Sequence, residues 1–61
     1  MTPSELRELR RKKGLSQAQL AAQLWISQAH IAKIEVGKRK INHRLYMQLK
    51  QLYPEEMKDI K

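Results

Sequence analysis

The sequence predicts an all-α fold, a compact bundle of five short helices in one domain that spans residues 1–61. Two observations lead to this prediction: apolar residues recur at helical spacing along the chain, and each such segment begins at a residue that suits a helix N-terminus. A chain of this length has a marginal core, and without cysteine it has neither a disulfide nor a thiolate zinc site to hold it together. Its stability must therefore come from helix packing, supplemented by a partner subunit if it has one.

Two of the predicted helices meet at a sharp turn in the middle of the chain. Ser16 and Ser27 each precede a helical pattern, where a serine hydroxyl can accept a hydrogen bond from the first turn, and Gln19 completes a capping box with Ser16. We interpret this segment as a central helix-turn-helix over about residues 17–36, with helices at about 17–24 and 28–36. Its apolar residues are Leu20, Ala21, Leu24, Ile26, Ile31 and Ile34.

The N-terminal helix precedes this motif. It begins with a capping box formed by Thr2 and Glu5, and Leu6 and Leu9 give it a buried stripe. Gly14 is expected to end it as a left-handed cap, since glycine adopts positive φ without strain.

Two further helices follow the motif. Asn42 is expected to cap a fourth helix, and Pro54 suits the first position of a fifth. The predicted core stripe of the fourth helix consists of Leu45, Leu49 and Leu52.

The charge of the chain favours a polyanionic partner. Its formal net charge is +7, and eleven of its 13 Lys and Arg residues lie in residues 1–50, against Glu5, Glu8 and Glu35. Two dense basic runs, residues 10–13 and 38–40, flank the helix-turn-helix on either side, which is the footprint expected of a duplex-binding module. The alternative reading is that these runs are solvated surfaces that keep a small protein soluble.

The central motif resembles the helix-turn-helix of the XRE family, the Cro and repressor class of bacterial and phage regulators. The resemblance rests on Gln17 at the start, Ala21 at the helix crossing and the closing Ile34-Glu35-x-Gly37-Lys38, together with the apolar pattern given above. It covers the whole chain and implies a lambda-repressor-like DNA-binding domain. One position departs from the family pattern, because Trp25 stands where a glycine with positive φ is usual. Either the turn is built differently here, or packing of the indole recovers a cost of roughly 1 kcal/mol or more.

The second motif helix is the expected recognition helix. Ile31 and Ile34 direct one face toward the core, so the opposite face is left to enter the major groove. Gln28 suits a bidentate contact with adenine and Lys33 a contact with guanine, although plain solvent exposure is the alternative for both. The small residues Ala29 and Ala32 allow close approach, and the resemblance adds Ser27. The predicted base contacts are therefore Ser27, Gln28, Ala29, Ala32 and Lys33.

Other residues are expected to position the protein on the DNA backbone. The amides at the N-terminus of the first motif helix can receive a phosphate, and the basic loop after Gly37 leads into the cap of the fourth helix. The resemblance also implies that Gln17 bridges toward the recognition helix and that Arg10 pairs with Glu35, in which case Arg10 orients the fold more than it binds DNA. The predicted phosphate contacts are Gln17, Arg10, Lys38, Arg39, Lys40, Asn42, His43 and Arg44.

Nothing in the sequence suggests catalysis. His30 and His43 are the two histidines, no glycine-rich phosphate loop is present, and the serines read as helix-start residues. We therefore expect neither an enzyme nor a metal or other cofactor. Trp25, Tyr46 and Tyr53 could stack on single-stranded nucleic acid, but aromatic residues at this spacing more often pack in a core or an interface.

The C-terminal third carries apolar residues that a monomer would expose. Met47 lies opposite Leu45 and Leu52 on the fourth helix, and Met57 and Ile60 follow near the end. We therefore expect a symmetric dimer interface formed by Met47, Met57 and Ile60.

The sequence as a whole predicts a regulator of transcription that binds double-stranded DNA, a Cro- or repressor-like protein on a pseudo-palindromic operator as a homodimer. Two alternatives stay open: an antitoxin-type regulator that also binds a partner protein, and a module that binds protein or RNA instead of duplex DNA. The sequence contains neither a membrane-spanning apolar run nor a signal-peptide pattern, so we expect a soluble, nucleoid-associated protein in the cytoplasm of a bacterial or phage-infected cell.

Overall fold

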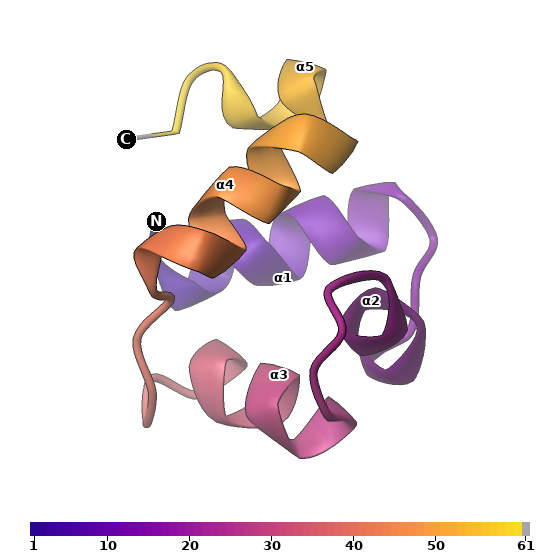
Figure 1. The fold of residues 1–61 in the computed structure, drawn as a ribbon, viewed down its shortest axis with the longest axis vertical. Coiled ribbons are helices and arrows are strands. Elements are labelled where there is room, and N and C mark those ends of the chain that lie inside the picture. The colour runs from indigo at the N-terminus through magenta and orange to yellow at the C-terminus, as the bar shows by residue number, and fades with distance from the viewer. Residues whose placement is uncertain (61) are drawn as a thin grey trace.

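The computed structural model describes residues 1–60, and their backbone forms five α-helices joined by short connections (Figure 1). The helices are α1 (Pro3–Lys12), α2 (Gln17–Gln23), α3 (Gln28–Glu35), α4 (His43–Leu52) and α5 (Pro54–Met57). The expected all-α fold is confirmed, and each end of the helix-turn-helix helices lies within one residue of its predicted position. In Figure 1, α3 lies along one side of the molecule, α5 lies on the opposite side, and α1 runs between them.

The predicted capping boxes are present at the first two helices. The hydroxyl of Thr2 accepts from the Glu5 amide at 3.2 Å, and the Glu5 carboxylate accepts from the Thr2 amide at 2.6 Å. The same reciprocal pair joins Ser16 and Gln19 at 3.0 and 2.8 Å. Each cap satisfies amides that the helix itself leaves unpaired and contributes about 1 kcal/mol of stability. The capping residues therefore determine where these helices begin.

Three consecutive helices end in the same backbone motif, in which amides beyond the helix donate back to carbonyls of its last turn. The motif requires a residue with positive φ just after the helix, and that residue has φ of +69° at Gly14, +60° at Trp25 and +82° at Gly37. At the end of α2, the Ile26 amide donates to the Ala21 carbonyl at 3.0 Å, which closes the turn into α3. Trp25 therefore stands at a turn position that is occupied by glycine after α1 and α3.

Both expectations for Trp25 are wrong. The turn is not built differently, because Trp25 adopts the positive φ that the family pattern implies. Nor does packing recover the cost, because the side chain is 86% exposed. A left-handed conformation at a residue with a β-carbon costs about 1–2 kcal/mol, and within residues 1–60 no packing of the indole offsets it.

The core lies between the helices and is built from the predicted apolar stripes, except that Met57 is buried in place of Leu52. Leu52, expected inside, is 45% exposed, whereas Met57 is 1% exposed. The reason is that Pro54 redirects the chain after α4, so α5 folds back and Met57 covers the end of the core that Leu52 would otherwise fill. The buried apolar residues are Leu6, Leu9, Leu20, Ala21, Leu24, Ile31, Ile34, Leu45, Leu49 and Met57.

This exchange corrects the expected dimer interface. Met57 belongs to the core of its own chain and has no surface left for a second copy. Ile60 is half-buried against the same core, and its carbonyl accepts from the Tyr46 hydroxyl at 2.9 Å. Of the three predicted interface residues, Met47 alone is exposed, at 39%.

Candidate nucleic-acid interface

A buried carboxylate at the end of α3 joins three helices. Glu35 is 4% exposed, and its Oε2 accepts from Nε of Arg10 on α1 at 2.7 Å. Its Oε1 accepts from Nη2 of Arg10 and from Nε2 of Gln17 on α2, both at 3.2 Å. The Arg10–Glu35 pair and the Gln17 bridge implied by the family resemblance are therefore both formed, and together they fix α3 relative to α1 and α2.

Arg7 takes part in this network, although the sequence reading did not single it out. Its Nη2 donates to the main-chain carbonyl of Glu35 at 2.8 Å, and its Nε lies 3.8 Å from Oε1 of that residue. The guanidinium thus satisfies a carbonyl that the last turn of α3 leaves unpaired. The signal in the sequence is its spacing, because Arg7 stands three residues before Arg10 on the same face of α1.

The network keeps Glu35 ionised. Burial is the largest influence and raises the pKa of Glu35, but it is outweighed by the hydrogen bonds from Arg10 and Gln17 and by the charges of Arg10 and Arg7. The net result is a pKa below the ordinary value of 4.5. A buried pair of this kind is costly to break from one side only, because the remaining charge stays buried without its partner.

Part of the first basic run is engaged within the fold. Arg10 is committed to Glu35 and to the Leu15 carbonyl, which accepts from Nη1 at 2.9 Å, so we correct its assignment as a phosphate contact. Nζ of Lys13 pairs with Glu56 at 3.0 Å and lies 5.6 Å from the centre of the Tyr53 ring. Two of the four cations in residues 10–13 are thus used inside the fold.

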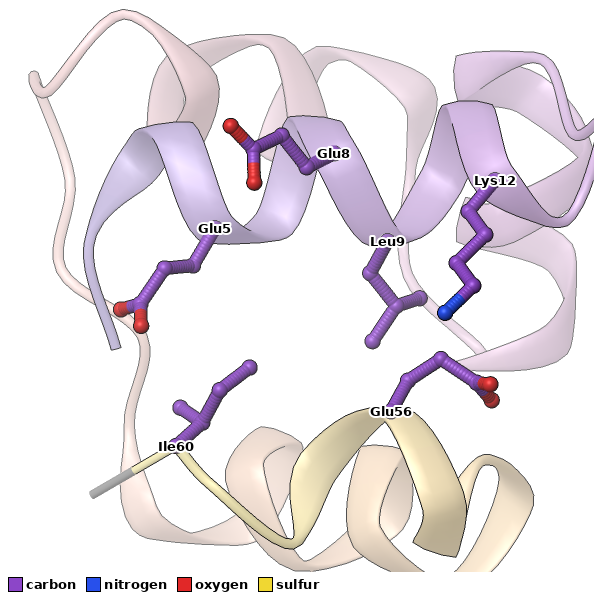
Figure 2. Close-up of a pocket in the computed structure, with 6 residues that line it drawn as sticks. All are labelled: Glu5, Glu8, Leu9, Lys12, Glu56 and Ile60. Carbon is purple, nitrogen blue, oxygen red and sulfur yellow. The ribbon is translucent and has the colours of Figure 1, made fainter.

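Acidic side chains gather on the side of α1 that faces α5. Figure 2 shows Glu5 and Glu8 from α1 and Glu56 from the α5 segment around a pocket that Lys12 also lines. Because α1 lies between α3 and α5 (Figure 1), this pocket lies on the side away from the recognition helix. The acidic residues Glu5, Glu8 and Glu56 thus lie away from α3, and a polyanion is favoured on the α3 side.

The outer face of α3 is exposed as the helical spacing predicts. Gln28, Ala29 and Lys33 are exposed and Ala32 is half-buried, while Ile31 and Ile34 enter the core. The hydroxyl of Ser27 accepts from the His30 amide at 3.2 Å and so caps the helix, which leaves its proton available for donation. All five predicted base-contacting residues are thus brought together at one helix face and its N-terminal end.

The second basic run forms an exposed cationic loop directly after α3. The amides of Lys38 and Arg39 both donate to the Lys33 carbonyl, at 2.9 and 3.3 Å, which ties the loop to the recognition helix. The side chain of Asn42 accepts from the Leu45 amide at 2.8 Å and begins α4 as predicted. The exposed residues of the loop and the first turn of α4 are Lys38, Arg39, Lys40, Asn42, His43 and Arg44.

His30 lies at the flank of α3, between this loop and the core. Its Nε2 is buried and has no hydrogen-bond partner within residues 1–60. Burial, followed by the charges of Arg39 and Lys33, lowers the pKa of His30 below its ordinary value of 6.5. Protonation of the ring is thus disfavoured next to the cationic loop.

These features define a helix-turn-helix DNA-binding domain: two capped helices at a sharp turn, an exposed recognition face and a cationic loop beside it. The model of a protein family described as "Helix-turn-helix" matches residues 6–51, and the chain therefore belongs to this family, which is the helix-turn-helix of the XRE type. The protein is accordingly a DNA-binding transcription regulator of that type. Neither a curated protein nor a solved structure matches the chain.

Across residues 1–60, none of the helices has the length and apolar character needed to cross a membrane. Over the same range, no three His, Asp or Glu side chains gather in a way that could hold a metal ion.

Proposed function

We propose that this protein is a Cro-like repressor that binds a pseudo-palindromic operator as a homodimer, with α3 of each copy in the major groove of one half-site. The observation that carries the proposal is the exposed face of α3, held in place by the buried Glu35 network. Repression would follow from occupation of promoter DNA. Its expected location is the nucleoid of a bacterial or phage-infected cell.

The chemistry of the α3 face supports sequence readout. The Gln28 amide can donate to and accept from adenine, and the Lys33 ammonium can donate to O6 and N7 of guanine. Ala29 and Ala32 are small enough to let the helix backbone approach the bases and can touch a thymine methyl group. A bidentate contact of this kind discriminates by about 1–3 kcal/mol against a wrong base.

Backbone contacts would come from the segments on either side of α3. The exposed side chains from Lys38 to Arg44 supply cations and donors, and the N-terminal amides of α2 at Gln17 can donate to a phosphate oxygen. Such contacts set the register of α3 without reading sequence, and they make affinity depend on salt.

Selection from random duplex DNA at physiological salt, followed by sequencing of the retained pool, tests the proposal. Enrichment of an inverted repeat with half-sites about 10 bp apart is the expected result. Retention without enrichment would contradict sequence-specific binding and favour a non-specific module. No retention of duplex DNA would reject the proposal and favour a protein or RNA partner. A retained inverted repeat together with a stably bound partner protein would instead identify an antitoxin-type regulator.

A further inference from the structure

The conformation of Trp25 is costly, and packing against residues 1–60 does not offset the cost. Its φ of +60° lies in the region that Gly14 and Gly37 occupy at the matching positions of α1 and α3. The indole does not offset this cost by burial, because it is 86% exposed. An exposed tryptophan in a strained turn is most easily explained by a contact outside its own chain.

Trp25 is part of a larger exposed surface that joins the α2–α3 turn to α4. A shallow depression there also includes Leu52, the residue that leaves the predicted core stripe and is 45% exposed. Met47 stands four residues before Gln51 on α4, so it extends the same helix face. We define the Trp25 patch as Gln23, Trp25, Met47, Gln48, Gln51 and Leu52.

The patch carries no charged residue, although the whole chain has a net charge of +7. Two copies of such a chain repel each other at their cationic surfaces, so a neutral apolar surface is where they can approach. Nucleic acids and acidic proteins bind at surfaces that carry cations. The Trp25 patch has no charged residue, so its composition favours neither kind of partner.

The polar residues of the patch are suited to pairing with themselves. A two-fold interface places the same surface on both sides, and a glutamine amide carries both a donor and an acceptor. The Tyr53 hydroxyl donates to Oε1 of Gln23, which leaves the NH₂ group of the Gln23 amide to donate to a neighbour. Oε1 of Gln48 is buried and accepts no hydrogen bond from the part of the chain that the structure describes.

We infer that the Trp25 patch is the surface through which two copies of this chain associate about a two-fold axis. The indole of each copy packs against Leu52 and Met47 of the other, and the three glutamines form the rim. Trp25 is thereby the buried aromatic anchor of the interface. The inference rests on the homodimer of the proposed function and replaces Met57 and Ile60 with a surface on the α2–α3 turn and α4.

Trp25 is the single tryptophan of the chain, so its fluorescence reports on the patch directly. The first experiment measures sedimentation and tryptophan emission of the DNA-free protein from micromolar to millimolar concentration. The expected result is a doubling of mass and a shift of emission to shorter wavelength over the same concentration range. A protein that stays monomeric throughout, or that dimerises with unshifted emission, overturns the inference.

The second experiment uses W25G, which removes the indole and places at this turn the residue found at Gly14 and Gly37. The variant should keep its helical circular dichroism and remain monomeric at concentrations where the unmodified protein is dimeric. L52Q should weaken dimerisation at least tenfold while Trp25 is still present. V36A is the matched control, because Val36 is also an exposed apolar residue but lies outside the patch, and its dimerisation should be unchanged. Full dimerisation of W25G would overturn the inference.

Binding to a single half-site separates this inference from the proposed function. W25G should bind one half-site as tightly as the unmodified protein does and should lose only the added affinity of the inverted repeat. Loss of half-site binding in W25G would show that Trp25 contacts DNA, and it would overturn the inference. If DNA selection enriches no sequence but W25G still abolishes dimers, the proposed function fails while the interface stands.

Discussion

Nε of Arg10 on α1 lies 2.7 Å from Oε2 of Glu35 at the end of α3, and this contact fixes the recognition helix on the rest of the molecule. The pair is supported from two further sides by Arg7 and Gln17. Because the carboxylate is buried, its charge depends on these partners more than an exposed pair would. A change at Arg10 should therefore act on stability first and on DNA affinity only through the orientation of α3.

Replacement of Arg10 by methionine should destabilise the fold by about 3–5 kcal/mol, because the Glu35 charge is then left buried with fewer partners. For a domain of this size such a loss is a large part of the total stability. Urea unfolding followed by circular dichroism measures it. The control is R11M, an exposed neighbour in the same basic run, which should change the unfolding free energy by no more than about 0.5 kcal/mol. Equal effects at the two positions would show that the pair contributes little.

The local features of this fold could be predicted from sequence because they depend on neighbouring residues. Caps such as Thr2 and Asn42 act within one helical turn, and the structure places both as expected. The exchange of Leu52 and Met57 could not be predicted, because it depends on how α5 folds back after Pro54. Helical spacing gives the direction of a side chain but not what lies opposite it.

The candidate site also has one part that could be predicted from the sequence and one part that could not. The exposed face of α3 follows from the positions of Ile31 and Ile34, so its residues could be named from the sequence. The role of the first basic run could not, because Lys13 finds Glu56 only when α5 lies beside α1. A run of cations in a sequence does not show which of them the fold uses internally.

The stability of the fold should fall as the solution is acidified below pH 6.5. Burial and the nearby charges lower the pKa of His30, so below 6.5 the unfolded chain takes up a proton that the folded chain resists. This contribution is present above pH 6.5 and is lost as the pH falls through the lowered pKa. Thermal unfolding at pH 7.5 and pH 5.5 measures it. In H30Q the difference between the two pH values should shrink, and an unchanged difference would assign it to other groups.

Substitutions at Lys33 and Lys38 should separate base readout from backbone contact. K33A should relax the preference at one position of the selected half-site, with a loss of about 1–3 kcal/mol on the best sequence. K38A should weaken binding to all sequences alike and reduce the dependence of affinity on salt by about one counterion. Titration of a set of single-base variants at two salt concentrations measures both effects. A uniform loss in K33A would place Lys33 at the backbone instead of at a base.

The strain at Trp25 predicts an unusual order of stability for the glycine and alanine variants at the end of α2. Both W25G and W25A remove the indole, but alanine keeps the β-carbon that disfavours a φ of +60°. At other helical positions a protein with glycine is less stable than one with alanine by about 0.5–1 kcal/mol, because glycine loses more conformational freedom on folding. Here the left-handed conformation reverses that order, and W25G should be more stable than W25A by about 1 kcal/mol. Thermal unfolding at micromolar concentration, where association contributes least, should show melting temperatures about 4–8 °C apart. If W25A is instead as stable as W25G, the turn does not hold the left-handed conformation and the cost assigned to Trp25 is absent.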